Sequence, residues 1–327
     1  MESIDTLETD IRNSQNFQRQ DEIKRQKFQI VNQVGMIYTI GNAFLSQGGD
    51  IFYTIINKFF PNFFKTKRGD SILLATLIVN QIFGILLMFF MTKFIKKIEI
   101  KKRAYGCKKY FATLLINSGL LVFGFIIGIP IEYSLSNKKS SENLKKATVN
   151  EPNIFLEYIV LCLTAPITEE FIFRKFLIDR LAIYSKTLAI FSSGIMFGIF
   201  HKNFGQLFST TFSGWVLAYA YAETGNILIS ISYHIIENSL SAIFNLKFLK
   251  NNQIIEKIFF VIALLRFIEA LIGIIILIVI RKKIRVTGED NKSSDNWKFF
   301  KSYGMWIFVF EGFILFSLFY LNKLLYK

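Results

Sequence analysis

NIFLEYIVLCLTAPITEEFIFRKFLIDRLA, residues 153–182, is a long apolar stretch with two adjacent acids, Glu169 and Glu170, just past its middle. Burying an ionisable group in hydrocarbon costs about 3 kcal/mol or more, so an acid inside a membrane helix is a candidate functional residue by default. The chain has two histidines, His201 and His234, and both lie in apolar segments downstream of the acids. These groups together predict a polar active site built inside a membrane.

The composition of the whole chain supports a membrane protein. Of its 327 residues 52% are apolar and 16% are aromatic. Several uncharged runs approach the roughly 20 residues that a helix needs to cross a hydrocarbon core of about 30 Å. Soluble domains of this length rarely contain so many such runs. We therefore expect an all-α fold, a polytopic transmembrane bundle of about eight or nine helices.

The apolar runs also predict where the helices lie. We expect them near residues 71–95, 110–132, 153–182, 187–204, 207–222, 226–246, 257–281 and 303–323. Residues 29–64, interrupted by glycines and Pro61, predict one weak spanning helix plus an interfacial piece. The mixed charge of residues 1–28 predicts a polar cytoplasmic arm. This divides the chain into an arm (1–28), N-terminal spans (29–152), a core with the acids and histidines (153–246) and C-terminal spans (247–327), with 286–297 as a linker.

The net charge of +15 would suggest nucleic-acid binding in a soluble protein. Here the basic residues gather between the apolar runs, chiefly in the loops 93–109 and 281–301, and the positive-inside rule explains them. We expect no nucleic-acid partner, a surrounding lipid bilayer, and a multi-pass cell-membrane protein with both loops and the N-terminus in the cytoplasm. The loop 133–152, with four lysines, would then face outward, against the rule.

The first chemical element surrounds the two acids. Pro166 can open the helix backbone, and Thr168 would then cap a helix that restarts at Glu169. Glu170 and Arg174 are four residues apart, which predicts an ion pair on one helix face. Glu169 points about 100° away from Glu170 and would face a cavity as a general base. The alternative is a helix that begins at the membrane interface, where exposed acids favour the first turn.

Two further elements each contain a histidine. Phe197 and His201 share a helix face, so the ring would wall the pocket into which the imidazole projects. His234 and Asn238 are also four apart, and their side chains can act on one atom, the amide donating a hydrogen bond to a developing oxyanion. The structural alternatives are His201 at a membrane edge beside Lys202, and interhelical hydrogen bonding by the His–Asn pair. Every histidine of the chain lies in these elements, which favours function.

Taken together, Glu-Glu-x-x-x-Arg, Phe-x-x-x-His and His-x-x-x-Asn resemble the three motifs of the CPBP intramembrane proteases. That family contains the CAAX prenyl endoproteases and bacterial homologues called Abi or bacteriocin-processing proteins. The matching positions are Glu169, Glu170, Arg174, Phe197, His201, His234 and Asn238, within about residues 153–246. The resemblance implies a helical bundle that encloses a polar catalytic cavity and hydrolyses a peptide bond there.

The resemblance also implies a role for each residue. Glu169 with His201 would activate the attacking water. His234 with Asn238 would stabilise the oxyanion. Glu170, Arg174 and Phe197 would support the shape of the site. The expected substrate is a peptide or a membrane protein, and the oligomeric state stays open.

Metal dependence stays open as well. The chain lacks His-Glu-x-x-His, and two histidines cannot make a three-histidine zinc site. Glu169, His201 and His234 together form the alternative zinc-ligand set, although we expect no obligatory cofactor.

Two rival interpretations remain. A non-catalytic membrane protein, such as a bacteriocin-immunity partner, would bind a peptide in the same cavity without cutting it. A transporter with a proton relay would need paired broken helices in two related halves, and the sequence suggests one break, at Pro166. The intact set of catalytic residue types favours an integral-membrane endopeptidase. Arg266 and Glu269, three apart in the span 257–281, predict a structural ion pair, with the cavity mouth as the alternative.

Overall fold

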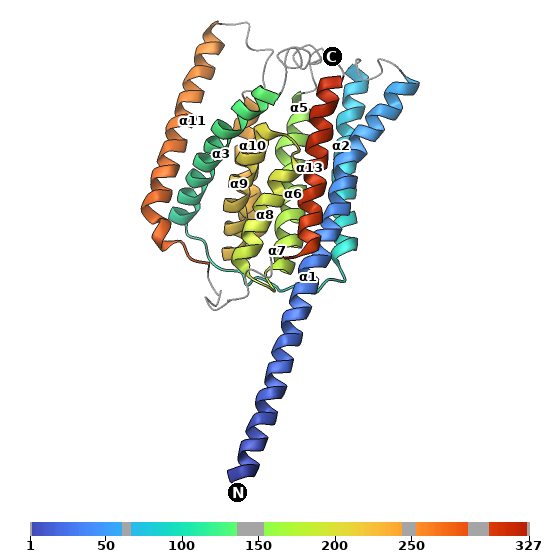
Figure 1. Cartoon of the computed structure of the whole chain (residues 1–327). Helices are drawn as coiled ribbons and strands as arrows, with labels where there is room; N and C mark the ends of the chain where they lie inside the picture. The colour runs from blue at the N-terminus through green and yellow to red at the C-terminus, as the bar shows by residue number, and fades with distance from the viewer. Residues whose placement is uncertain (1, 61–66, 136–153, 244–252, 287–300, 326–327) are drawn as a thin grey trace.

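The computed structural model describes residues 2–60, 67–135, 154–243, 253–286 and 301–325 (Figure 1). Every regular element in these ranges is a helix, which confirms the predicted all-α class. The elements are α1 (Glu2–Phe59), α2 (Lys67–Thr92), α3 (Cys107–Leu135), α5 (Ile154–Tyr158), η2 (Ile159–Thr164), α6 (Ala165–Glu170), η3 (Phe171–Phe176), α7 (Leu177–Leu181), α8 (Lys186–Phe200), α9 (Phe204–Thr224), α10 (Ile227–Ile243), α11 (Gln253–Ile280), η5 (Arg281–Lys283) and α13 (Tyr303–Leu325). Of these, η2 and η3 are π-helical and η5 is a 3₁₀ turn.

The helices pack side by side with apolar outer surfaces. Two described stretches, Cys107–Leu135 and Gln253–Lys283, are long and apolar enough to cross a membrane. Shorter apolar helices fill the rest of the bundle, and large side chains such as Phe260, Val279 and Phe310 are exposed on the outside. So many large apolar side chains on the outside are unusual for a soluble monomer and suit contact with lipid. The surface therefore fits a membrane location.

From residue 71 onward, each predicted helix is present with its ends displaced by at most four residues. The apolar runs are long and uninterrupted there, which makes the pattern easy to interpret. The predicted linker 286–297 and the loop 133–152 lie almost entirely outside the described residues.

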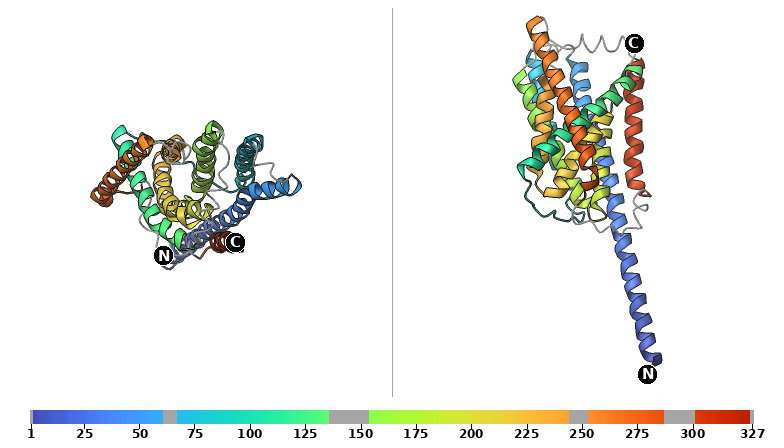
Figure 2. Two further views of the ribbon diagram at one scale, coloured as in Figure 1. Left: turned by 90° about the horizontal axis from the view of Figure 1, so that it is seen from above. Right: turned by 90° about the vertical axis from the view of Figure 1, so that its left-hand side faces the viewer.

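The first sixty residues differ from the prediction in their form. The arm, the weak span and the interfacial piece are parts of one helix, because α1 runs unbroken from Glu2 to Phe59, and its first half projects from the bundle (Figures 1 and 2). Residues 2–34 contain neither glycine nor proline and are rich in good helix formers, which explains the extension. Gly35 serves packing: a Cβ there would lie 2.2 Å from the carbonyl carbon of Gly304 in α13.

The stretch that contains the two acids forms one continuous helical run from Ile154 to Leu181, so the predicted break at Pro166 is wrong. Pro166 has no N–H to donate, and it lies directly after the π-helical turn η2, whose wider hydrogen-bond register absorbs the missing bond. The predicted cap is also wrong, because the Thr168 hydroxyl donates to the Thr164 carbonyl at 2.8 Å. Two π-helical turns therefore flank the acids, an arrangement often found at functional sites.

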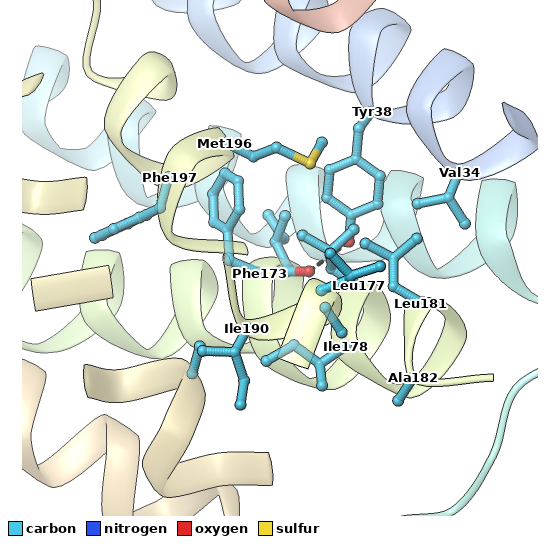
Figure 3. Close-up of a cluster of buried hydrophobic side chains, with 14 of the residues drawn as sticks. Val34, Tyr38, Phe173, Leu177, Ile178, Leu181, Ala182, Ile190, Met196 and Phe197 are labelled. Carbon is cyan, nitrogen blue, oxygen red and sulfur yellow. Dashed lines mark hydrogen bonds between the residues drawn. The ribbon is translucent and has the colours of Figure 1, made fainter. Parts of the chain in front are cut away.

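A buried hydrophobic cluster supports this helical run from behind (Figure 3). It joins residues of α1, η3, α7 and α8, among them Tyr38, Phe173 and Leu177. Two side chains satisfy backbone acceptors of η3. The Tyr38 hydroxyl donates to the Ile172 carbonyl at 2.5 Å, and the Ser193 hydroxyl donates to the Phe173 carbonyl at 2.7 Å. The backbone just after the acids is thus fixed by two neighbouring helices.

One end of the bundle collects the basic segments. The loop 93–106 crosses this end and is attached by backbone hydrogen bonds from Ile98 to the Asp179 carbonyl (2.8 Å) and from Arg103 to the Thr224 carbonyl (2.9 Å). The basic turn η5 and the projecting part of α1 lie at the same end (Figure 1). The lysines and arginines of both loops therefore share one side of the bundle, as far as the structure describes them.

Candidate active site

The innermost part of the site is a buried ion pair. Arg174 Nε lies 3.0 Å from Glu170 Oε2, and both side chains are fully buried. A buried charge pair needs further partners to offset its loss of solvation. Arg174 Nη1 donates to Ser193 Oγ at 3.3 Å, and its guanidinium carbon lies 4.8 Å from the centre of the Phe197 ring. The predicted ion pair is present, and it fixes the Glu170 carboxylate in one place.

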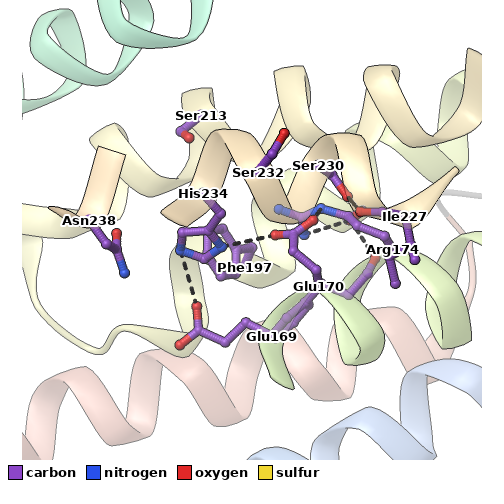
Figure 4. Close-up of polar contacts among 12 residues, drawn as sticks. Glu169, Glu170, Arg174, Phe197, Ser213, Ile227, Ser230, Ser232, His234 and Asn238 are labelled. Atoms are coloured by element: carbon purple, nitrogen blue, oxygen red, sulfur yellow. Dashed lines mark hydrogen bonds and ion pairs between the residues drawn. The ribbon is translucent and has the colours of Figure 1, made fainter. Parts of the chain in front are cut away.

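His234 lies between the two acids (Figure 4). Its Nδ1 is 3.1 Å from Glu170 Oε1, and its Nε2 is 3.6 Å from Glu169 Oε2. A carboxylate only accepts hydrogen bonds, so Nδ1 is the donor and Glu170 the acceptor of this hydrogen bond. The Glu169 side chain is 17% exposed, whereas that of Glu170 is fully buried. The two adjacent acids therefore differ: one orients the imidazole, and the other reaches the accessible side of the ring.

Phe197 lies between the functional side chains. Its ring centre is 4.9 Å from that of His201 and 5.6 Å from that of His234, with both imidazoles nearly perpendicular to it. Edge-to-face contact of this kind is the preferred geometry of aromatic pairs. Phe197 is itself almost fully buried, so it holds both imidazoles in place.

The predicted helix 187–204 would have placed His201 inside it. In the structure α8 ends at Phe200, and His201 lies at its end. Lys202 follows it with a left-handed backbone (φ 54°), which ends the helix. His201 Nδ1 is 2.8 Å from the Phe197 carbonyl oxygen. Since a carbonyl can only accept, Nδ1 donates, and Nε2 of the neutral ring has its lone pair free. Among the described side chains, His201 forms no direct ion pair with Glu169; the acid's imidazole contact is His234.

Asn238 follows His234 by one helical turn on α10 (Figure 4). Its amide nitrogen donates to the Leu161 carbonyl in η2 at 2.8 Å. A side-chain amide has two N–H donors, so this contact leaves one for another acceptor. The contact ties the second half of α10 to the π-helical turn that precedes the acids.

Two serines of the site were not predicted. Ser193 connects Arg174 to the backbone of η3, and buried Ser230 lies close to Glu170. Each precedes a predicted site residue, Phe197 or His234, by four residues on the same helix. Extending the helix-face argument by one turn would have found both.

The alternative zinc-ligand set of Glu169, His201 and His234 is not gathered into a metal site. Within the described ranges, no three side chains of the His, Cys, Asp and Glu types come close enough together to hold a metal ion. These residues do not fit a preformed zinc centre.

Comparison with known proteins finds relatives of the segment that contains the acids and the histidines. Residues 151–240 match the sequence model of the family described as type II CAAX prenyl endopeptidase Rce1-like. Over 116 residues the chain is 33% identical to the protein named "Putative membrane peptidase YdiL" of Bacillus subtilis (strain 168), which covers 35% of this chain and 47% of that protein. The alignment thus spans about half the length of this curated relative.

No solved structure matches the chain. The segment matched to the family contains all three motifs, from Glu169 to Asn238. The resemblance to the CPBP intramembrane proteases is thereby confirmed for residues 151–240, the segment that is similar to the Rce1-like membrane peptidases.

Proposed function

We propose that this chain is an integral-membrane endopeptidase that hydrolyses a peptide bond beside Glu169 and His234. The observation that carries the proposal is the position of the His234 imidazole between two acids that lie more than sixty residues earlier in the chain. A purely structural histidine needs one partner, whereas this ring contacts a fixed carboxylate and an accessible one. The match to a peptidase family supports peptide-bond hydrolysis as the reaction.

Glu169 acts as the general base. Its carboxylate is the more accessible of the two acids, and Glu170 is already held by Arg174. A water between Glu169 and the free Nε2 of His201 would be oriented by both groups. Glu169 takes one proton from this water, and the hydroxide oxygen bonds to the carbonyl carbon of the substrate.

His234 and Asn238 stabilise the charge that then develops on the carbonyl oxygen. His234 would donate to this oxygen from Nε2, and Asn238 would donate from its second N–H. Donors that are already oriented toward a developing oxyanion are worth roughly 100- to 1000-fold in rate. The C–N bond breaks, the proton held by Glu169 passes to the leaving nitrogen, and a carboxylic acid and an amine result. Glu170, Arg174 and Phe197 keep the donors in place.

The arrangement of the chain supports a location for this chemistry. We infer a multi-pass protein of the cell membrane, with catalytic core 153–246 between membrane spans 29–152 and 247–327. The projecting helix, loop 93–106 and η5 lie at one end of the bundle, which the positive-inside rule assigns to the cytoplasm. The basic residues lie where this end of the bundle would meet the cytoplasmic membrane surface. The partners are therefore lipid and a peptide or membrane-protein substrate, and not nucleic acid.

Cleavage of a peptide library by purified protein in detergent or liposomes tests the proposal. We expect wild type to cleave and Glu169→Gln and His234→Ala each to lose about 100-fold or more in rate, the magnitude found for catalytic donors and bases. Glu256→Gln, exposed near the start of α11, is the matched control and should cleave like wild type. Loss of activity with a chelator, restored by zinc, would replace the metal-free mechanism.

The rival function is a binding partner that holds a peptide without cutting it. It predicts that Glu169→Gln retains peptide binding and full activity in the cell. If both site variants behave in this way and wild type cleaves nothing, the endopeptidase proposal is wrong.

A further inference from the structure

A second buried charge cluster lies beside the helix that carries His234. Arg266 of α11 extends one nitrogen, Nη2, to Glu237 Oε2 of α10 at 2.5 Å and the other, Nη1, to Glu269 Oε2 at 2.6 Å. The side chains of Arg266 and Glu237 are 12% and 2% exposed. The sequence predicted the Arg266–Glu269 pair, but the link to Glu237 joins two different helices.

Apart from Arg266, α11 is attached to the bundle along α3. It lies at the outer edge beside that helix (Figure 2), and its buried residues are Ala270 and Gly273. At this α3 contact the backbones approach closely, since a Cβ on Gly273 would lie 1.8 Å from the Leu115 carbonyl oxygen. Arg266 is thus an ionic tie from a peripheral, largely lipid-facing helix to α10. Charges inside a membrane bundle are costly and are retained where they have a task.

The tie is attached close to the catalytic side chains. Glu237 follows His234 by three residues and directly precedes Asn238, so its position fixes the rotation of this part of α10. The first half of α10 is held separately, by the Tyr233 hydroxyl, which donates to the Tyr110 carbonyl at 2.8 Å. The second half is held by the contact of Asn238 with Leu161 and by the ion pair of Glu237 with Arg266.

We propose that Arg266 is a positioning residue of the active site. Through Glu237 it sets the rotation and height of α10, and so holds His234 and Asn238 against the two acids. The inference rests on the proposed endopeptidase function for its catalytic consequence. Arg266 lies outside the residues 151–240 that match the family.

The chemistry of the side chain makes this role specific to arginine. A planar guanidinium presents two separate nitrogens to two carboxylates at once, whereas a lysine ammonium is a single point charge. Arg266→Lys therefore preserves the charge but loses the fork between Glu237 and Glu269. A role that required only charge balance would tolerate this change.

Kinetics of cleavage form the first arm of the test. For Arg266→Gln and Arg266→Lys we expect kcat to fall about 10-fold with KM within about twofold, the pattern of a misplaced catalytic group. The double variant Arg266→Gln/Glu237→Gln removes both charges together and should recover part of the loss of the single change. Glu256→Gln on the same helix is the control with wild-type kcat. Wild-type kcat in both Arg266 single variants would overturn the proposal.

The second arm does not depend on proteolysis. The Tyr158 hydroxyl and Ser239 Oγ are 3.1 Å apart, so cysteines at these positions report how α10 lies against α5. In a Cys107→Ser/Cys162→Ala background, a short bifunctional thiol reagent should cross-link Tyr158→Cys and Ser239→Cys rapidly. Adding Arg266→Gln or Arg266→Lys should slow the cross-link severalfold, and adding Glu256→Gln should not change it.

The two arms separate the two proposals. An altered cross-link in a protein that cleaves no peptide would leave the positioning role in place and refute the endopeptidase. Normal cleavage by the Arg266 variants with an unchanged cross-link would refute the positioning role and leave the endopeptidase proposal in place. If Arg266→Gln does not fold, Arg266→Lys keeps the positive charge and provides the same measurement.

Discussion

Glu169 and Glu170 are neighbours in sequence with different surroundings. Glu170 is fully buried against Arg174 and His234, while Glu169 reaches the other imidazole nitrogen and stays partly accessible. The difference follows from helical geometry, because adjacent residues point about 100° apart. One acid can therefore orient the histidine while the other remains available to a water molecule.

Removing Arg174 would leave Glu170 as a buried charge without its guanidinium. We expect Arg174→Met to destabilise the protein by about 3–5 kcal/mol, the cost of breaking a buried pair. The double variant Arg174→Met/Glu170→Gln should be markedly more stable than this single variant, since the isolated charge is gone. Unfolding in a denaturing detergent titration measures both, with exposed Lys102→Met as the control. Equal stability of Arg174→Met and wild type would refute the interpretation.

At the scale of helices, the sequence predicted the existence of the bundle elements well and their irregularities poorly. The apolar runs from residue 71 onward are long enough to span a membrane, and such runs form helices. The π-helical turns around Pro166 were missed, because a one-residue change of hydrogen-bond register leaves the apolar pattern almost unchanged. The polar composition of residues 2–28 predicts an arm but not its form, which follows from their helix propensity.

The site was predictable to the same degree. Spacing by four placed Glu170 with Arg174 and Phe197 with His201, because such pairs depend on one helix alone. The contact of His234 with both acids and the reach of Arg266 to Glu237 depend on how distant helices meet. A single sequence contains no local signal for either contact.

Close helix contact through glycine gives a test at this scale. Gly273→Ala would place a Cβ 1.8 Å from the Leu115 carbonyl, so α3 and α11 must separate. We expect a loss of about 1–3 kcal/mol, typical of overpacking. Gly106→Ala is the matched control, because no atom lies within 4 Å of its Cβ position. Thermal unfolding of the two variants tests this. Similar midpoints would show that α3 and α11 accommodate the added methyl group without loss of stability.

At the scale of the molecule, the basic segments define one end of the bundle, and a native cysteine reports on it. Cys107 is exposed where the loop 93–106 meets α3, and Cys162 is buried. With that end in the cytoplasm, a membrane-impermeant maleimide should label Cys107 in inverted vesicles and leave it unlabelled in intact cells. Cys107→Ser should abolish the label. Labelling from outside intact cells would invert the proposed orientation.

The unbroken course of α1 has a mechanical consequence. At about 1.5 Å per residue its 58 residues form a rod of roughly 87 Å. The rod begins beyond the basic end of the bundle and continues past Tyr38, whose hydroxyl is bonded to the Ile172 carbonyl, two residues past Glu170. Because a continuous helix is stiff, a rotation of its distant tip would be transmitted along it to the backbone beside the acids.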